Sequence, residues 1–139
     1  MDRRVKSLGG IFFKSKDSAR LKEWYSTHLG INTDSYGANF SWLKADGTKG
    51  YTVWSLFKED TTYFEPGEQE YMINYRVENL EELLATLKSE GVQVIGEMEV
   101  QDYGKFGWIM DPEGKKIELW EPNDPEFGKI LESENVSEW

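Results

Sequence analysis

The stretch at residues 107–122, GWIMDPEGKKIELWEP, constrains the fold more than any other part of the chain. An apolar run leads into a turn, where Pro112 fixes the backbone of the first corner and Gly114 tolerates the positive φ that closes it. Sheet-forming residues then resume, with a single carboxylate, Glu118, among them. The pattern predicts two strands joined by a tight turn. A glutamate in such a strand either faces solvent at an edge or belongs to a buried site, because a buried carboxylate needs specific partners.

The first half of the chain predicts a strand, an amphipathic helix and further strands. A strand pattern covers residues 8–15, and the helix begins after Asp17, a good N-cap, and ends at Gly30. Strand patterns at 39–44 and 51–57 follow, joined by the turn-rich segment ADGTKG. Apolar residues recur along the helix at a spacing of three or four, so we expect one of its faces to be apolar.

The second half repeats this order of elements. Residues 71–77 form a strand pattern, and Asn79 then caps a helix that carries a stripe of leucines. Strand patterns at 92–100, 106–110 and 116–120 complete this half. A repeated order of elements indicates two modules of one fold placed in series.

We therefore expect residues 1–139 to form a single domain of two modules. The expected divisions are a first module at about 7–60, a linker at about 61–70, a second module at about 71–122 and an acidic tail at 123–139. The linker has no clear period, and we expect it to form a loop at the rim of the site. The tail carries three apolar residues that could dock on the body or on a partner subunit: Phe127, Ile130 and Leu131.

Composition excludes several classes of function. The chain has 16 Lys and Arg against 26 Asp and Glu, which argues against nucleic-acid binding because phosphate contacts need clustered cations. It has no cysteine, so disulfides, thiolate metal sites and cysteine nucleophiles are excluded. No apolar run is long enough to span a bilayer, and the first residues lack the features of a signal peptide. We expect a cytoplasmic protein without a nucleic-acid or membrane partner.

The chain resembles a known superfamily in two segments. The ending DPEGKKIELWEP, together with FFKSKDSARLKEWYSTHLGI in the first module, resembles the vicinal oxygen chelate superfamily of glyoxalase I, bleomycin-resistance proteins and extradiol dioxygenases. This resemblance covers about residues 7–122. It implies an α+β fold of two tandem βαβββ modules, whose curled mixed sheets enclose a cup and carry one helix each outside. It also implies a homodimer, and the linker permits the modules to pair within one chain or between two.

The metal positions implied by this resemblance are filled by residues that do not suit a metal. They correspond to one position on the first and one on the last strand of each module: Gly10, Trp54, Met72 and Glu118. Only Glu118 offers an oxygen ligand to a hard divalent ion, and such a site needs three or more protein ligands. The single histidine, His28, lies at the end of the predicted helix. We therefore expect no metal and no cofactor.

Strand alternation predicts which side chains face the inside of the cup. The expected ligand-binding residues are Phe12, Lys14, Trp54, Met72, Asn74, Arg76, Trp108, Glu118 and Trp120. Aromatic walls with a few polar groups suit a small, partly flat organic ligand. Lys14 and Arg76 either neutralise Glu118 or hold a ligand carboxylate, for which the guanidinium fork is the better shape.

Two functions from different classes follow from this site. In the first, the protein binds a small aromatic or carbonyl-containing molecule without turnover, as bleomycin-resistance proteins do. In the second, it is a metal-independent isomerase, epimerase or lyase in which Glu118 is the general acid and base, with Asn74, Lys14 or Arg76 polarising the substrate. A divalent-metal lyase or dioxygenase would require other ligand positions. We favour binding, because enzymes of the superfamily mostly use the metal that this chain is not expected to hold.

Overall fold

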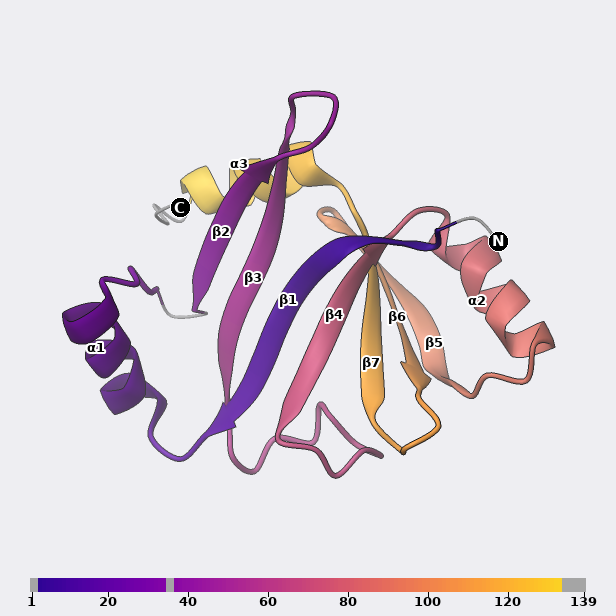
Figure 1. Ribbon diagram of the computed structural model, residues 1–139, viewed down its shortest axis with the longest axis horizontal. Coiled ribbons are helices and arrows are strands. Elements are labelled where there is room, and N and C mark those ends of the chain that lie inside the picture. Colours follow the sequence, from indigo (N-terminus) through magenta and orange to yellow (C-terminus); the bar gives the residue numbers. More distant parts are fainter. Residues whose placement is uncertain (1–2, 35–36, 134–139) are drawn as a thin grey trace.

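One mixed β-sheet of seven strands organises the protein, in the spatial order β2-β3-β1-β4-β7-β6-β5 (Figure 1). The computed structural model describes residues 3–34 and 37–133. The strands are β1 (Val5–Ser15), β2 (Ala38–Leu43), β3 (Lys49–Lys58), β4 (Tyr71–Val77), β5 (Val94–Gln101), β6 (Gly104–Met110) and β7 (Lys116–Pro122). The helices are α1 (Ser18–Leu29), α2 (Leu80–Ser89) and α3 (Asp124–Ser133). Within the described ranges, no helix is long and apolar enough to cross a membrane.

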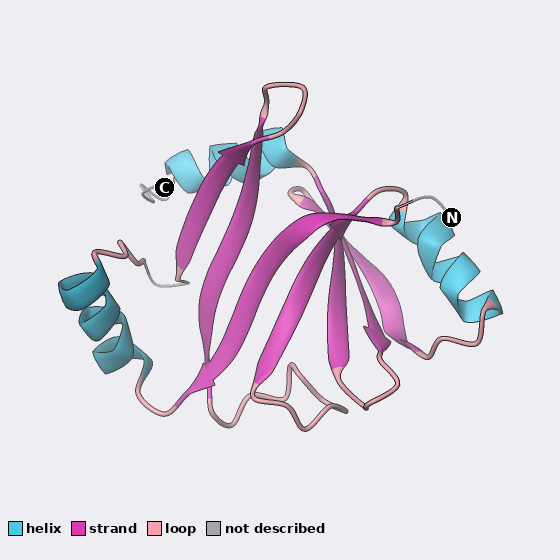
Figure 2. Ribbon diagram, in the orientation of Figure 1, coloured by secondary structure: helices cyan, strands magenta, loops and turns pink. Residues whose placement is uncertain are grey.

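The two halves of the sheet meet at β1 and β4, which run antiparallel at its centre with Gly10 opposite Asn74. β3 lies parallel to β1 on one side, and β7 lies parallel to β4 on the other. Each half therefore comes from one continuous part of the chain, and the two halves pair within a single chain. Figure 2 shows the sheet curling from β2 round to β5.

The predicted fold class, α+β with a curled mixed sheet, is confirmed. Within its described residues the first module has three strands, one fewer than the expected βαβββ order. The chain between α1 and β2 contains poor strand formers such as Asp34 and Gly37, and its described residues form no strand. The tail adds a third helix, α3, which begins where the side-chain oxygen of Asn123 accepts a hydrogen bond from the backbone N–H of Glu126 (3.2 Å).

The outer face of the sheet is covered unequally. α2 packs on β5, β6 and β7 through an apolar cluster in which Val77, Leu80 and Leu119 are buried. α1 has no buried side chain, and the ring of its Tyr25 lies edge-on to that of Trp54 at 4.9 Å. Helix packing derives its stability from buried apolar side chains, so α1 is the more weakly attached of the two helices.

A second core lies on the inner face, at the end of the cup where β1 and β3 finish. Phe12, Met72 and Trp108 pack there around Phe64, a residue of the linker that is fully buried. Burying an aromatic side chain of this size stabilises a fold by about 2 to 3 kcal/mol. The linker is therefore part of the core that joins the two halves.

Candidate functional site

A cavity of about 570 Å³ lies between the inner face of the sheet and α3. Much of its wall is aromatic or aliphatic, from Phe12, Phe106 and Trp120 of the sheet and from Phe127, Ile130 and Leu131 of α3. Phe106 stacks on Trp120 at 5.8 Å with the ring planes 8° apart, and Phe127 meets Trp120 edge-on at 5.3 Å. The cavity therefore offers aromatic surfaces from both the sheet and the helix.

Glu118 is a buried carboxylate in the wall of this cavity, with 2% of its surface exposed. Its Oε1 accepts a hydrogen bond from Asn74 Nδ2 (2.6 Å), and its Oε2 accepts hydrogen bonds from Trp108 Nε1 (2.9 Å) and from the Tyr63 hydroxyl. Burial raises the pKa of Glu118, while these three hydrogen bonds and the charge of Lys116 act to lower it. The carboxylate is thus held by neutral donors.

Strand pairing brings three of these side chains together. Glu118 lies opposite Asn74 of the parallel strand β4 on one side of β7, and opposite Trp108 of the antiparallel strand β6 on the other. Paired residues of neighbouring strands point to the same face of a sheet. The alternation of the strands in the sequence predicts this shared face.

Tyr63 completes the set of donors, and the sequence does not identify it as a site residue. It lies in the linker, where its ring stacks on Phe57 at 5.4 Å and its hydroxyl donates to Glu118. Burial, and next the negative charge of Glu118, raise the pKa of Tyr63, so its hydroxyl remains a donor at neutral pH. The linker has no period that assigns a face to its residues, and the adjacent aromatic pair of Tyr63 and Phe64 is its only signal.

Lys116 is a second residue that the sequence does not identify. Its Nζ donates to the backbone oxygen of Tyr63 (2.7 Å) and lies over the rings of Tyr63 and Trp108, 5.3 and 5.6 Å from their centroids. Burial lowers the pKa of Lys116, and the charge of Glu118 acts in the opposite direction. Lys116 does not line the cavity and instead supports the loop that carries Tyr63.

Arg76 does not line the cavity, contrary to the prediction from strand alternation. Its two terminal nitrogens donate to Asp124, the first residue of α3, at 3.0 and 2.5 Å. Its guanidinium also lies over the rings of Trp42 and Trp120, 5.0 and 5.3 Å from their centroids. Lys44 Nζ donates to the same carboxylate at 3.0 Å. The guanidinium of Arg76 therefore holds α3 in place by binding the carboxylate of Asp124, and not by binding the carboxylate of a ligand as expected.

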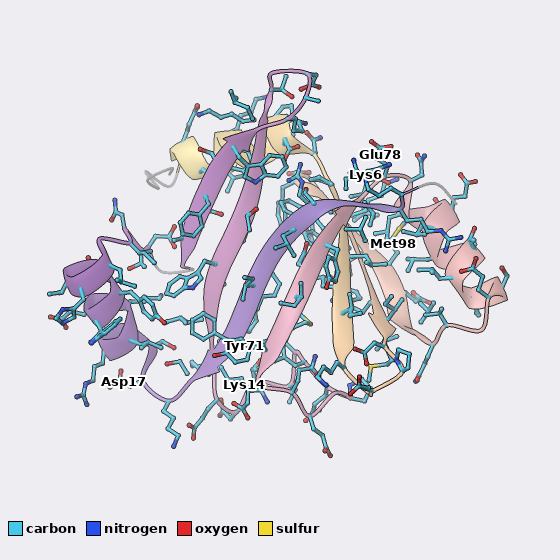
Figure 3. The ribbon with its side chains drawn as sticks, in the orientation of Figure 1. Lys6, Lys14, Asp17, Tyr71, Glu78 and Met98 are labelled. Carbon is cyan, nitrogen blue, oxygen red and sulfur yellow. The ribbon has the colours of Figure 1, made fainter. Side chains whose placement is uncertain are left out.

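Lys14 and Met72 also lie outside the cavity wall. The Nζ of Lys14 stands over the ring of Phe64 at 5.7 Å, at the end of β1 beside Tyr71 (Figure 3). Met72 is fully buried in the inner core next to Phe64. Neither of the two predicted cations reaches the cavity, so the prediction that they neutralise Glu118 or hold a ligand there is corrected.

Trp54 lies on the outer face of the sheet, where its ring contacts α1. The prediction that it faces the inside of the cup is wrong, because Trp54 is equivalent to Glu118 only if Gly50 is matched with the turn residue Gly114. Gly50 lies inside β3, and the residue with the turn conformation is Gly47, with φ of 83° beside 80° for Gly114. This shift of three residues reverses the face, and Val53 lines the cavity instead.

Of the nine predicted ligand-binding residues, the structure brings four to the wall of the cavity: Phe12, Asn74, Glu118 and Trp120. Trp108 reaches the site through its hydrogen bond to Glu118. The positions implied for a metal do not form a metal site, because Trp54 faces outward and Met72 is enclosed in the core. In the part of the chain that the structure describes, no three His, Cys, Asp or Glu side chains lie close enough together to hold a metal ion.

Several solved structures share this arrangement of strands and helices. Methylmalonyl-CoA epimerase from Mycobacterium tuberculosis has a TM-score of 0.58 at 20% identity, over 93% of this chain and 95% of that one. A variant of methylmalonyl-CoA epimerase from Streptomyces coelicolor, in complex with 2-nitronate-propionyl-CoA, has a TM-score of 0.63 at 15% identity, over 86% and 99%. A glyoxalase/bleomycin resistance protein/dioxygenase superfamily member from Vibrio splendidus 12B01 has a TM-score of 0.54 at 12% identity, over 83% and 99%. The chain has the vicinal oxygen chelate fold.

No protein-family model matches the chain, and no curated protein matches its sequence. At identities of 20% and below, the likeness to these structures concerns the vicinal oxygen chelate fold and not the substrate. In this chain the inner face of that fold carries an aromatic cavity with Glu118 in its wall.

Proposed function

We propose that the protein binds a small, flat and largely apolar organic molecule in the cavity under α3, without a metal and without turnover. The observation that carries this proposal is the aromatic cavity with a buried carboxylate in its wall. Its volume of about 570 Å³ falls within the range of small-molecule sites. Aromatic walls supply contact area, and a few polar groups fix the orientation of the ligand.

A panel of aromatic compounds with one to three rings tests this proposal. Binding is followed by the melting temperature and by tryptophan fluorescence, because Trp120 lies in the cavity wall. We expect Phe106→Ala, which removes part of the wall, to weaken the best ligand by about tenfold or more. Leu43→Ala is the control, since Leu43 is exposed and lies outside the cavity. If the wild type binds no compound, or if Phe106→Ala binds as tightly as the wild type, the proposal is wrong.

A metal-independent isomerase, epimerase or lyase is the second candidate function, and the burial of Glu118 favours it. A carboxyl group with a raised pKa takes up and releases a proton more readily near neutral pH, and Glu118 lines the cavity. Of the three predicted polarising groups, Asn74 is the one in the cavity wall.

Proton exchange distinguishes this enzyme from a binding protein. Aromatic ketones are incubated with the protein in D₂O, and deuterium at the carbon beside the carbonyl is measured by NMR. An enzyme of this kind accelerates exchange in the wild type and not in Glu118→Gln. If the ketones bind but exchange hydrogen for deuterium no faster than in buffer alone, the enzyme function is wrong and the binding function stands.

We also propose that the protein acts as a homodimer. Several large apolar side chains are exposed on α1 and on the central strands: Leu8, Trp24, Leu29 and Tyr71. Exposed apolar surface favours association, and α1 has no buried side chain of its own. Light scattering at micromolar concentration is expected to give twice the mass of the chain, and the mass of a single chain would contradict the proposal.

A further inference from the structure

Carboxylate and amide groups dominate the polar part of the cavity wall. They belong to four residues: Asp34, Asn39, Asn74 and Glu118. Tyr103 adds a hydroxyl, which both donates and accepts. No lysine or arginine of the described residues lines the cavity. The wall is therefore rich in oxygen acceptors and carries no positive charge to attract an anionic ligand.

Two amide oxygens at this cavity, Asn39 Oδ1 and Asn74 Oδ1, have no hydrogen-bond partner among the residues that the structure describes. The two residues are only 6% and 1% exposed, so bulk water reaches them poorly. A buried acceptor without a donor is unfavourable, and native proteins leave few of them unpaired. Both oxygens belong to residues that line the cavity, which adds to the acceptor character of its wall.

The orientation of the Asn74 amide is fixed by its neighbours. Its Nδ2 donates to Glu118 Oε1 at 2.6 Å, whereas the reverse orientation would set Oδ1 against that carboxylate oxygen. Gly9 makes room for Oδ1, because a Cβ at this position would lie 2.0 Å from it. Gly9 and Asn74 both line the cavity, so the unpaired oxygen lies between two residues of its wall.

Glu118 also has acceptor capacity left. A carboxylate offers about four lone-pair sites, and Glu118 receives two hydrogen bonds at Oε2 and one at Oε1. All three donors are neutral, so none of them offsets its charge. An N–H group of a ligand directed at Oε1 would complete the set.

We infer that the ligand is a flat aromatic ring system that carries an N–H donor group and no negative charge. This inference rests on the proposed function and adds the chemistry of the ligand to it. The ring packs on Phe106 and Trp120, and the N–H group faces the acceptor-rich part of the wall formed by Asn39, Asn74 and Glu118. Amino-substituted aromatic heterocycles and aromatic amidines have this chemistry. Aromatic carboxylates and phosphate esters do not, because they would place a second negative charge beside Glu118.

Three compounds with one ring system and different substituents test the inference: 4-aminoquinoline, quinoline and quinoline-4-carboxylate. Their affinities are measured at pH 7 by calorimetry and by tryptophan fluorescence. We expect 4-aminoquinoline to bind about tenfold tighter than quinoline, and the carboxylate to bind more weakly than quinoline. The variant Asn39→Leu keeps the number of side-chain heavy atoms and removes one unpaired oxygen, so we expect it to lower the advantage of the amine over quinoline to about threefold or less. Lys14→Gln, outside the cavity, is the control and should leave all three affinities unchanged.

The outcomes separate this inference from the proposed function. One outcome is that quinoline binds the wild type, that Phe106→Ala weakens this binding, and that the amine binds no more tightly than quinoline. In that case the inference is wrong and the proposed function stands. A carboxylate that binds as tightly as the amine also overturns the inference. If neither the three quinolines nor the aromatic panel binds, the proposed function itself is wrong.

Discussion

The proton on Glu118 couples the site to the stability of the protein. Burial raises the pKa of this carboxyl above its usual value of 4.5, so the folded protein binds the proton more tightly than the unfolded chain does. The contribution of Glu118 to the free energy of unfolding is therefore largest at low pH. It declines as the pH rises above about 4.5 toward the folded pKa, by at most about 1.4 kcal/mol per pH unit.

Replacing Glu118 with glutamine removes this decline. We expect Glu118→Gln to gain stability relative to the wild type as the pH rises from about 5 to 8, because the amide cannot ionise. The amide of Asn74 can turn to accept from the new side chain, which also pairs its Oδ1. Urea denaturation at several pH values measures the difference. A difference that does not change with pH would show that burial leaves the ionisation of Glu118 unaffected.

The hydroxyl of Tyr63 is expected to matter more for the charged carboxylate than for the neutral acid. Tyr63→Phe removes one of the two donors to Oε2 of Glu118 and leaves Trp108. We expect a loss of about 1.5 to 3 kcal/mol in the free energy of unfolding at pH 8, and a smaller loss at pH 5. Tyr71→Phe is a matched control, since Tyr71 is exposed. Equal losses at both pH values would assign the effect to packing alone.

Sequence reasoning finds site residues where the backbone is periodic and misses them where it is not. Alternation along β4 and β7 is a local property, and it is enough to place Asn74 and Glu118 on one face. The position of Tyr63 depends on how the linker folds back onto β3 and β7, and no local pattern encodes that contact. Arg76 is on the predicted strand, but its partner comes from α3.

At the scale of elements, α3 is held over the cavity by one buried carboxylate. Asp124 pairs with Arg76 of β4 and with Lys44, which follows β2. Both Asp124 and Arg76 are buried, so their charges depend on each other far more than those of an exposed pair. Phe127 packs on Tyr51 and Trp120 from the next turn of the helix.

Asp124→Asn is expected to loosen α3 and to weaken ligand binding. The change leaves the buried guanidinium of Arg76 without its counter-charge, which costs about 3 to 5 kcal/mol. Amide hydrogen exchange in 124–133 is expected to accelerate, and the affinity for the best aromatic ligand to fall. Glu126→Gln breaks the exposed pair with Lys129 on the same helix and serves as control, with a cost below about 0.5 kcal/mol. Similar effects of the two changes would contradict the role of Asp124.

Elements with clear start and stop signals are predicted well from the sequence, and turn registers are predicted poorly. The strand at 71–77 and the turn at Gly114 agree with the structure. The β2–β3 hairpin has two glycines close together, and composition does not show that Gly47 rather than Gly50 occupies the turn. Placing the turn at Gly50 and not at Gly47 shifts the predicted register by three residues, and this shift places Trp54 on the wrong face of the sheet.

At the scale of the whole molecule, the two halves share one inner core. Phe64 of the linker packs with Phe12 of β1, Met72 of β4 and Trp108 of β6, so each half completes the core of the other. We expect a single cooperative unfolding transition seen by both tryptophan fluorescence and circular dichroism. Two separate transitions would show that the modules are independent units.

Truncating Phe64 is expected to destabilise both halves together. Phe64→Ala removes a fully buried ring, at a cost of about 3 to 5 kcal/mol in the free energy of unfolding. Leu43→Ala, at a side chain that is 71% exposed, is the control, with a cost below about 0.5 kcal/mol. Denaturant unfolding measures both variants, and a small loss for Phe64→Ala would show that the linker is a passive connection.

The cavity has a floor and a roof that are encoded in different parts of the chain. The floor belongs to the sheet, which the fold needs, and the roof is α3, which follows the last strand and is joined to the rest by Asp124 and a few apolar contacts. Substitutions at Phe127, Ile130 and Leu131 therefore change the shape of the cavity on the α3 side and leave the strand order intact. Related proteins that keep Asp124 and differ at these three positions could therefore bind different ligands on the same fold.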